Sequence, residues 1–293
     1  QIQTFMRSGG TSLLTSLLKS LDEDILDAAA TALTSLSAPS VRKPEDRVFD
    51  FKGTQVYVKE LSFSDSGTAY NVWTAAMVLA QWMARSRTFA SCIDRGEKVL
   101  ELGSGLGVSG ILAAKLGGHV TLSDFVPHVL DNLEASVVLN AIQNRAVVRR
   151  LNWAEEAGVT GTCSNHGWYA GGDGGSGGGR EDERQHKTLD EEEHFDVIIG
   201  SDICYEHDHP ALLEGVLRRR LAQGGRIFFL YAVRFPTLHA QLLERLALFC
   251  RDVVSESIDS AEGAYAVDIV EEGCAQHSSK YAGGMQLVTA CRR

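Results

Sequence analysis

Residues 98–124 read KVLELGSGLGVSGILAAKLGGHVTLSD, and this stretch decides the fold of the chain. The apolar run Val99–Leu102 predicts a short buried strand, and the glycine-rich residues 103–107 after it predict a tight turn. Apolar residues at helical spacing then predict a helix, and a second strand, His119–Ser123, leads to Asp124. The order strand, glycine turn, helix, strand and acid is typical of half a nucleotide-binding βαβ unit.

The glycine turn and Asp124 are the first candidate ligand-binding residues. Gly103 and Gly105 lack a Cβ atom, so a ligand can lie against the backbone there. The helix that follows points unpaired N–H groups toward the same place. Asp124 lies at the expected distance of about 20 residues from the turn, where a carboxylate can accept hydrogen bonds from two ribose hydroxyls. The pattern therefore predicts a site for a ligand that carries a ribose.

Two classes of cofactor use such a unit, and Glu101 separates them. Gly105, Gly107 and Gly110 match the GxGxxG pattern of dinucleotide-binding folds. In that pattern the first glycine closely follows the strand, whereas Glu101 here puts a carboxylate at the strand end. A carboxylate suits a positively charged ligand better than a pyrophosphate. S-adenosylmethionine has a sulfonium, an ammonium and no phosphate, and it is therefore favoured over a dinucleotide.

The segment VLELGSGLGVSGILAA, the SDF at Ser123 and the later SDICY at Ser201 resemble the seven-strand S-adenosylmethionine-dependent methyltransferases. They are most similar to the protein-lysine methyltransferases with an Asp-x-x-Tyr motif, methyltransferase family 16. The resemblance implies an α/β fold with a doubly wound, Rossmann-like, seven-stranded mixed sheet and a C-terminal antiparallel hairpin. It also implies S-adenosyl-L-methionine as the cofactor. The cofactor-binding residues expected from it are Trp73, Glu101, Gly103, Ser104, Gly105, Asp124, Phe125, Asn152, Trp153 and Ser201.

The first part of the chain divides into an extension and the start of the main domain. Apolar residues at helical spacing predict a helical extension over residues 1–40, which either packs on the domain or docks to a partner. We expect the methyltransferase domain over residues 41–293. Val48–Leu61 alternates in polarity around Lys52-Gly53, and this pattern predicts a β-hairpin at the start of the domain.

An unusual segment interrupts the core after its third predicted strand, Ala146–Arg150. Asn152 and Trp153 follow that strand, where the family places residues beside the adenine. Residues 158–193 contain GGDGGSGGGR and an acid-rich run, and such sequence behaves as flexible coil. We predict a flexible insertion there rather than a domain boundary, because strands resume after it. These later strands are predicted at His194–Ser201, Arg226–Tyr231, Val253–Ile258, Ala266–Val270 and Met285–Ala290.

Asp202 and Tyr205 follow the buried strand that ends at Ser201, and they match the Asp-x-x-Tyr motif residue by residue. Methyl transfer from a sulfonium to an amine is an in-line displacement, so the protein mainly aligns the two reactants. A lysine must also lose its proton, against a reference pKa of about 10.4. Asp202 can hold the amine, and the Tyr205 hydroxyl and ring can receive it. The resemblance implies that both are catalytic and that the acceptor is a lysine of a protein substrate.

His207 and His209, on either side of Asp208, suggest a metal site. The H-D-H spacing matches no established zinc pattern, and the six cysteines form no C-x-x-C pair. We therefore expect no metal ion. Asp202 or His207 as a general base is an alternative role.

Composition restricts the partners and the compartment. The net charge of −10 argues against general binding to nucleic-acid backbones and suits a basic protein surface. No run approaches the roughly 20 apolar residues of a membrane span. The scattered cysteines fit a reduced compartment, so we expect the protein in the cytoplasm, with the nucleus as the other location. We also expect a monomer. Because the chain begins at Gln1 rather than Met, a preceding targeting segment stays open.

Three other functions stay open beside protein-lysine methylation. A small-molecule N-methyltransferase of the nicotinamide type would share the motif, and a closed pocket would favour it over the open groove expected for a protein substrate. A cofactor-binding scaffold without catalysis is the second, and the presence of Asp202 and Tyr205 argues against it. A dinucleotide oxidoreductase is the third, and Glu101 and the late antiparallel hairpin disfavour it.

Overall fold

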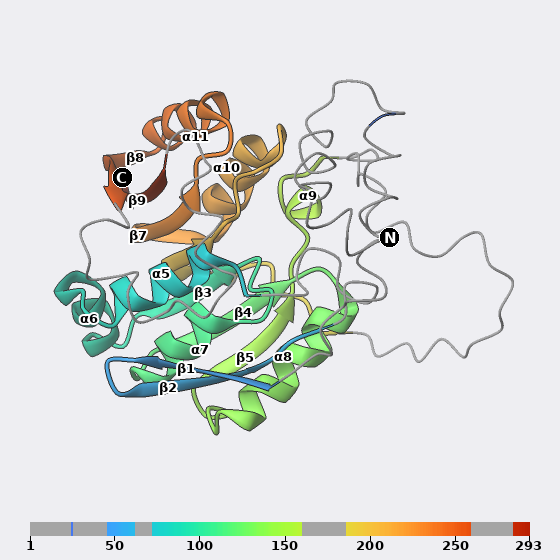
Figure 1. Ribbon diagram of the computed structural model, residues 1–293. Coiled ribbons are helices and arrows are strands. Elements are labelled where there is room, and N and C mark those ends of the chain that lie inside the picture. The colour runs from blue at the N-terminus through green and yellow to red at the C-terminus, as the bar shows by residue number, and fades with distance from the viewer. Residues whose placement is uncertain (1–24, 26–45, 62–71, 160–185, 259–283) are drawn as a thin grey trace, which may run out of the picture. The chain divides into compact units, whose positions relative to one another are not determined.

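The computed structural model describes residues 25, 46–61, 72–159, 186–258 and 284–293 (Figure 1). The chain divides into two compact units, Gln1–Glu45 and Asp46–Arg293, and every element below belongs to the second. Apart from Ile25, the predicted helical extension lies outside the described residues. The strand predicted at Ala266–Val270 also lies outside them.

A seven-stranded sheet in the order β5-β4-β3-β6-β7-β9-β8 forms the centre of the second unit. The strands from β3 to β7 are parallel to their neighbours, whereas β9 is antiparallel to both β7 and β8. This arrangement confirms the predicted mixed sheet with an antiparallel C-terminal pair. The strands are β3 (Lys98–Leu102), β4 (His119–Asp124), β5 (Ala146–Arg150), β6 (Phe195–Ser201), β7 (Leu221–Ala232), β8 (Cys250–Ile258) and β9 (Met285–Arg292).

The glycine stretch forms the predicted unit of β3, α7 (Val108–Lys115) and β4. Gly107 caps α7 with φ of 79°, a left-handed conformation that glycine adopts without steric cost. Gly110 lets α7 approach the sheet closely, because a Cβ atom there would lie 2.2 Å from Leu122 Cδ2. The glycines therefore serve both the turn and the packing of the helix on the sheet.

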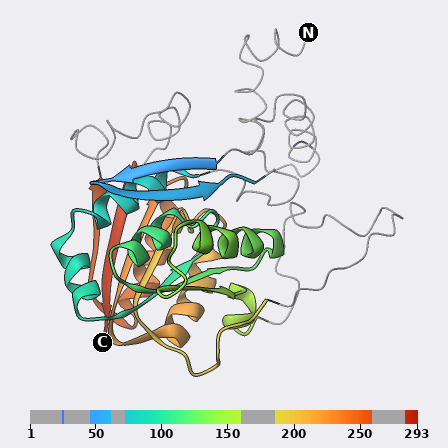
Figure 2. The same ribbon diagram turned by 90° about the horizontal axis from the view of Figure 1, so that it is seen from below.

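The predicted hairpin is also present, as β1 (Asp46–Phe51) and β2 (Thr54–Lys59). Lys52 and Gly53 between them both have positive φ, which is the backbone of a type I′ turn. The hairpin lies against α8 (Pro127–Leu139), as Figure 2 shows. The side-chain amide of Asn140, at the end of this helix, accepts the backbone N–H of Tyr57 and donates to its C=O. It thus covers helices rather than extending the main sheet.

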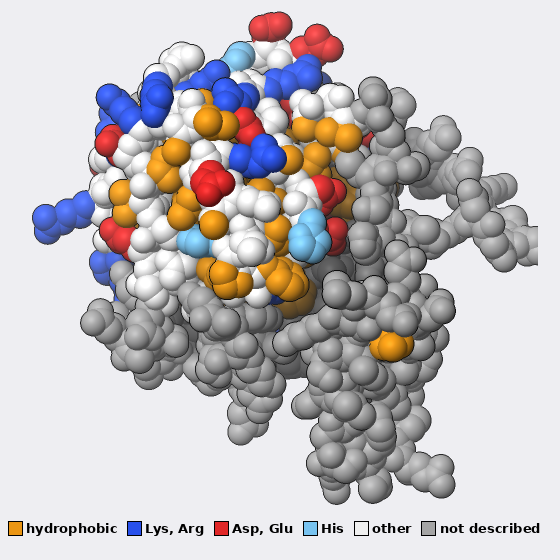
Figure 3. All heavy atoms as spheres, turned by 90° about the horizontal axis from the view of Figure 1, so that it is seen from above, with side chains coloured by type: hydrophobic (Ala, Val, Ile, Leu, Met, Phe, Trp, Pro, Cys, Tyr) orange, Lys and Arg blue, Asp and Glu red, His pale blue; other side chains and the backbone are white. Residues whose placement is uncertain are grey.

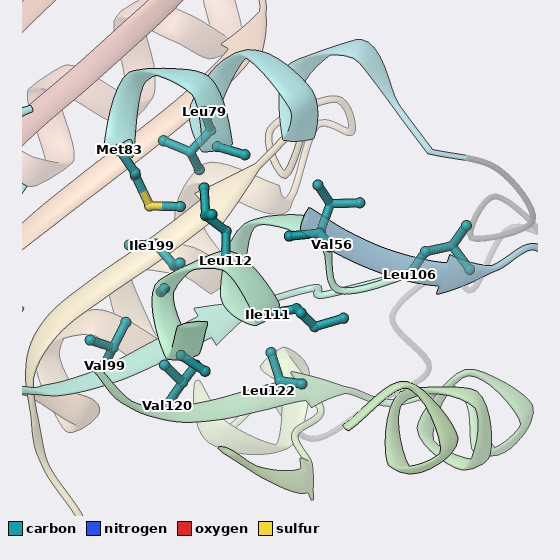
Figure 4. Close-up of a cluster of buried hydrophobic side chains, with 14 of the residues drawn as sticks. Val56, Leu79, Met83, Val99, Leu106, Ile111, Leu112, Val120, Leu122 and Ile199 are labelled. Atoms are coloured by element: carbon teal, nitrogen blue, oxygen red, sulfur yellow. The ribbon is translucent and has the colours of Figure 1, made fainter. Parts of the chain in front are cut away.

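The two faces of the sheet carry separate hydrophobic cores. Alternate residues of a strand point to opposite faces, so Val99 joins one core and Leu100 the other. The first core includes α7, α8, the hairpin, α5 (Thr74–Met83) and α6 (Arg87–Asp94), and Figure 4 shows part of it. The second is built from α10 (His209–Arg220) and α11 (Pro236–Ala247), beside the short α9 (Trp153–Glu156).

Several boundaries differ from those predicted. Helix α6 was not predicted, because it has only eight residues, although its three buried residues, Phe89, Cys92 and Ile93, recur at helical spacing. Strand β7 begins five residues before the predicted Arg226, since Leu221 pairs with Phe195 across an irregular register. The polar and glycine residues between Leu221 and Arg226 hide this start from a search for apolar runs.

The last eight residues of the predicted insertion pack on the domain. The N–H of Arg150 donates to the carbonyl of Lys187 at 3.0 Å, and Leu189 is buried. Arg220, itself buried, donates to the carbonyl of Asp190 at 2.5 Å and to both carboxylate oxygens of Glu156 at 2.7 Å. The predicted insertion is therefore too long at its C-terminal end, while residues 160–185 lie outside the described part.

The surface of the second unit mixes charges of both signs. Figure 3 shows Lys and Arg side chains among Asp and Glu side chains over the face seen from above. On α10, for example, Glu214 pairs with both Arg218 and Arg245, at 2.9 and 2.6 Å. Among the helices of the described residues, none is long and apolar enough to cross a membrane.

Candidate active site

The carboxyl ends of β3, β4, β6 and β7 meet at one edge of the sheet, because these four strands are parallel. Ligands of open α/β sheets bind outside this edge, where the strand order reverses. Here the order reverses between β3 and β6. The glycine turn, Asp124 and the Asp-x-x-Tyr residues all follow these strand ends, so the fold brings the predicted site residues to one edge.

Asp124 holds the glycine turn through backbone groups. One carboxylate oxygen accepts the N–H of Gly105 at 3.1 Å, and the other accepts the N–H groups of Phe125 and Val126 at 2.8 and 3.2 Å. Burial raises its pKa, and these three donors oppose that effect. Since a carboxylate has about four acceptor positions, one remains for a ligand hydroxyl.

Ser104 and Ser123 tie the turn to β4. The N–H of Ser104 donates to the carbonyl of Ser123 at 2.8 Å, and the N–H of Ser123 donates back to Ser104 Oγ at 2.9 Å. The Ser123 hydroxyl in turn donates to the carbonyl of Glu101 at 2.5 Å. The structure thus gives Ser104 a role in fixing the turn, in addition to the predicted contact with the cofactor.

Glu101 points into the start of α7. Its Oε1 accepts the N–H of Gly110 at 3.0 Å, and Oε2 is buried without a hydrogen-bond partner among the described residues. Burial raises the pKa of Glu101 to about 7, because the charged form loses its hydration. The predicted contact of Glu101 with the cofactor therefore stays a prediction, beside a contact with α7 that the sequence did not indicate.

Asn152 and Trp153 lie at the start of α9. Asn152 is the N-cap, and its side chain accepts the N–H of Ala154 at 2.9 Å. The Trp153 ring lies over the glycine turn, because a Cβ atom on Gly103 would be 3.3 Å from Trp153 Cζ2. The position of Trp153 beside the turn agrees with the predicted base contact, whereas the Asn152 amide is engaged in capping.

Asp202 has the most unusual environment of the predicted residues. Its φ is 54°, a left-handed conformation that is uncommon in residues other than glycine but that aspartate adopts more readily than most. Oδ2 accepts a hydrogen bond from the Arg234 guanidinium at 2.6 Å, while Oδ1 is buried without a partner among the described residues. Ser201, the residue before it, pairs with Leu230 of β7.

A cluster of three rings lies at this edge, with His209 between Tyr205 and Trp153. The centroid of the His209 ring is 4.5 Å from that of Tyr205 and 5.4 Å from that of Trp153, both in edge-to-face geometry. His209 Nδ1 lies 3.0 Å from the carbonyl of Ile203. Burial lowers the pKa of His209, which favours the neutral ring. The histidine therefore connects the residue expected beside the base with the residue expected beside the acceptor.

The loop after β6 also contains the residues considered for a metal site. One ligand atom each of Glu206, Asp208 and His209 lies within 4.8 Å of the others. His207 instead lies against Phe235, with ring centroids 6.1 Å apart. The expectation that this loop binds no metal ion stays a prediction.

Comparison with known proteins finds two family models that are similar to parts of this chain. Residues 52–166 match the family model described as lysine methyltransferase, and residues 1–38 match the model of the Armadillo/beta-catenin-like repeat. The first match covers β2 of the hairpin, the glycine unit, Asp124 and Trp153, and it ends before Asp202. This part of the chain is therefore similar to the lysine methyltransferase family.

Two relatives share this methyltransferase region. EEF1A lysine methyltransferase 3 of Xenopus tropicalis is 30% identical over 176 residues, which are 58% of this chain and 61% of the relative. Protein N-lysine methyltransferase METTL21A of Danio rerio is 33% identical over 153 residues, 50% of this chain and 54% of the relative. The chain thus matches less than two thirds of the length of either relative.

A solved structure supports the methyltransferase fold. The T. thermophilus 16S rRNA N2 G1207 methyltransferase RsmC, in complex with AdoMet and guanosine, superposes with a TM-score of 0.50 at 16% identity. The match covers 85% of this chain and 50% of that one. At this identity the likeness concerns the fold alone, and it agrees with the seven-strand sheet described above.

The residues at the carboxyl ends of these strands fit S-adenosylmethionine. The turn between β3 and α7, GSGLG, contains no lysine or arginine to meet a phosphate. Asp124 keeps one acceptor position, and Asp202 Oδ1 is a buried acceptor without a donor. Acceptors of this kind suit a ligand that brings hydroxyls and positive charge. These acceptor oxygens therefore agree with S-adenosylmethionine, the cofactor that the resemblance implied.

Two residues of this edge were missed in the sequence. Arg234 lies on Asp202, and its guanidinium carbon is 5.5 Å from the Tyr205 ring centroid and 5.9 Å from that of Trp73. Trp73, predicted to bind the cofactor, is thereby placed against this arginine. His209 was considered only as a metal ligand. Arg234 follows β7, the neighbour of β6, so the sheet order of the methyltransferase fold would have indicated it.

Proposed function

We propose that this protein transfers a methyl group from S-adenosylmethionine to a lysine side chain of a protein substrate. The observation that carries the proposal is Asp202 Oδ1, a buried carboxylate oxygen without a hydrogen-bond partner among the described residues. Asp202 follows β6, the sheet neighbour of the strand that leads into the glycine turn. The match to the lysine methyltransferase model supports the choice of reaction. Tyr205, three residues later, presents a ring and a hydroxyl beside the same arginine.

Each half of the edge would perform a separate task. Asp124, Ser104 and the glycine turn would bind the ribose and the amino-acid part of the cofactor, and Trp153 would cover its base. The cofactor supplies a methyl carbon already activated by the positive sulfur, so the chain's own residues need only align an amine with it. Asp202 Oδ1 would accept an N–H of that amine and leave the nitrogen lone pair directed at the methyl group.

The proton of the acceptor leaves before the transfer. A lysine ammonium has no lone pair, and its reference pKa of about 10.4 keeps it protonated in water at neutral pH. Contact with the rings of Tyr205 and Trp73 removes water from the amine, and desolvation favours the neutral form. The released proton passes to solvent, so the site needs no strong base such as His207.

The substrate is proposed to be a protein, with elongation factor 1A as the first candidate. This choice follows from the name of the relative, EEF1A lysine methyltransferase 3. The acidic net charge of −10 would favour a basic protein surface over a nucleic acid. We also propose that the protein acts as a monomer in the cytoplasm.

The decisive experiment is the labelling of a cell lysate with methyl-labelled S-adenosylmethionine and the purified protein. We expect a labelled protein band in which mass spectrometry finds a methylated lysine, and purified elongation factor 1A is tested in parallel. The control is Asp202→Ala, which should give no label. Label on an arginine, or only on small molecules such as nicotinamide, would contradict the proposal.

A further inference from the structure

Arg234 occupies the space beside the acceptor oxygen of Asp202. Its guanidinium donates to Asp202 Oδ2 at 2.6 Å, and the side chains of Arg234 and Asp202 are 20% and 9% exposed. The same guanidinium lies over the rings of Tyr205 and Trp73. Three side chains, those of Asp202, Tyr205 and Trp73, thus surround the positive charge of Arg234.

The two oxygens of Asp202 have different surroundings. Oδ2 is occupied by Arg234, whereas Oδ1 is buried and lacks a hydrogen-bond partner among the described residues. The ion pair fixes the orientation of the carboxylate, so Oδ1 has one direction. A buried acceptor without a donor is costly unless a ligand completes it. Oδ1 is therefore the oxygen available to an incoming N–H group.

The charge of Arg234 has a second consequence for an amine. An unpaired carboxylate would hold an ammonium as an ion pair and so favour the protonated form. The guanidinium offsets the charge of Asp202 and stands as a like charge beside any ammonium. A neutral amine loses nothing by this, because it needs only an acceptor for one N–H.

We propose that Arg234 is a positioning residue that makes the acceptor site select the neutral amine over the ammonium. It does so by fixing Asp202 with Oδ1 toward the acceptor and by cancelling the charge that would otherwise retain the proton. The inference rests on the proposed function in one respect, that the acceptor is an alkyl amine. It adds a residue outside the Asp-x-x-Tyr motif to the acceptor site.

Burial shifts the pKa values of three titratable groups near this pair away from neutral pH. Burial raises the pKa of the Cys204 thiol to about 12 and raises that of the Tyr231 hydroxyl as well. Burial lowers the pKa of His209 and keeps the ring neutral. Among the described residues, the titratable side chains around Asp202 and Arg234 are those of Cys204, Tyr205, Glu206, Asp208, His209 and Tyr231.

The test is the pH dependence of binding of n-butylamine, an analogue of the lysine side chain, to the full chain. Binding is followed by tryptophan fluorescence at pH 7.5 and 9.5, because Trp73 lies against Arg234. If only the neutral amine binds, the apparent affinity of the wild type should rise about 90-fold between these pH values, given a reference amine pKa of about 10.4. n-Butanol, which does not titrate, reports any change of the protein itself.

Three variants separate the charge from a structural role. Arg234→Gln should reduce the pH effect to less than about tenfold, because the unpaired Asp202 then binds the ammonium as well. Arg234→Lys should keep most of the pH effect, since it keeps the charge. Arg245→Gln is the matched control, because Arg245 makes an ion pair of the same 2.6 Å length with Glu214 on the surface. It should behave as the wild type.

The proposal is overturned if Arg234→Gln keeps the wild-type pH effect, or if Arg234→Lys loses it to the same extent as Arg234→Gln. Absence of saturable n-butylamine binding to the wild type also overturns it. Melting temperatures of all variants show whether each is folded, and Arg234→Lys keeps the test decisive if the glutamine variant is not. Since the titration requires no methyl transfer, its failure is distinguishable from a failure of lysate labelling.

Discussion

Asp124 and Asp202 stand at the carboxyl ends of two parallel strands of one sheet, and both are mostly buried. Asp124 accepts three backbone N–H groups, one from Gly105 in the glycine turn and two from Phe125 and Val126, which follow Asp124 in the chain. Asp202 accepts one side-chain donor, from a residue 32 positions later, and leaves one oxygen unpartnered. The first acid is held by local backbone, whereas the second depends on a distant side chain and is left incomplete.

This difference indicates that Asp124 has a structural and ligand-binding role, whereas Asp202 has a role in the reaction. A carboxylate satisfied by backbone donors is fixed in advance and contributes a rigid surface on which a ligand can be bound. A carboxylate with an unsatisfied buried oxygen is stable only because the fold imposes it, and a ligand with a donor relieves it. We therefore expect substitutions at Asp124 to change cofactor affinity and substitutions at Asp202 to change turnover.

The largest effect is expected for Asp202→Ala. Methyl transfer should fall by at least about 100-fold, comparable to the loss of one positioned polar group in other active sites. Cofactor affinity, measured by calorimetry, should stay within about twofold of the wild type. Asp202→Asn is the control for the backbone, because asparagine tolerates positive φ better than alanine. Equal turnover by the wild type and Asp202→Ala would reduce Asp202 to a polar strand end.

The second prediction uses Glu101, an acid whose pKa is raised mainly by burial, although hydrogen bonds to its carboxylate oppose the rise. Its pKa of about 7 in the folded protein lies above the value of about 4.3 expected in the unfolded chain, so folding favours the protonated form. The stability that this provides is complete below about pH 4 and is lost as pH rises through 7, by up to about 4 kcal/mol.

Glu101→Gln, which cannot ionise, should remove this pH dependence. Urea unfolding of the wild type and the variant between pH 4.5 and 8 measures it, and the difference in unfolding free energy should shift in favour of the glutamine variant as pH rises. A difference that stays constant over this range would show that Glu101 ionises normally in the folded state.

Asp124→Ala should weaken cofactor binding by about 1–3 kcal/mol, because a hydrogen-bonded acceptor and the support of the glycine turn are both lost. Calorimetric titration with S-adenosylmethionine measures this, and NAD should give no signal with either protein. If turnover at saturating cofactor fell as strongly as in Asp202→Ala, the proposed division between the two acids would be wrong.

The smallest effect is expected for Tyr205→Phe. Only a hydroxyl is removed, so the ring contacts with His209 and Arg234 remain and the fold is kept. Both kcat and kcat/KM should fall by about tenfold, since a positioning contact made mainly in the transition state is lost. Single-turnover methylation of the labelled substrate, with cofactor affinity measured alongside, tests this. An increase of KM alone would assign the hydroxyl to substrate binding.

The sequence predicted the half of the site that is built from neighbouring residues. Gly105 and Asp124 are 19 residues apart and belong to one βαβ unit, so periodicity and glycine spacing were enough to place them together. The hairpin around Lys52-Gly53 was predictable for the same reason, because its turn type is decided by two adjacent residues.

The contact of Arg234 with Asp202 was not predictable in this way. It depends on β7 lying next to β6 and on the path of the chain after β7, neither of which a local pattern contains. The positive φ of Asp202 was likewise not predicted, because aspartate tolerates this conformation but adopts it only in a minority of cases. His209 was read as a possible metal ligand, since only the folded chain shows Tyr205 and Trp153 on two sides of it.

Arg220 has a practical consequence for protein engineering. It binds Glu156, shortly before residues 160–185, and the backbone of Asp190, shortly after them, so one side chain on α10 fixes both borders of that segment. The entropy of closing a loop between fixed ends grows only with the logarithm of its length. A reporter domain inserted between Glu156 and Asp190 would therefore be joined to the protein at two points that Arg220 holds, whereas Arg220→Ala would release both attachment points together.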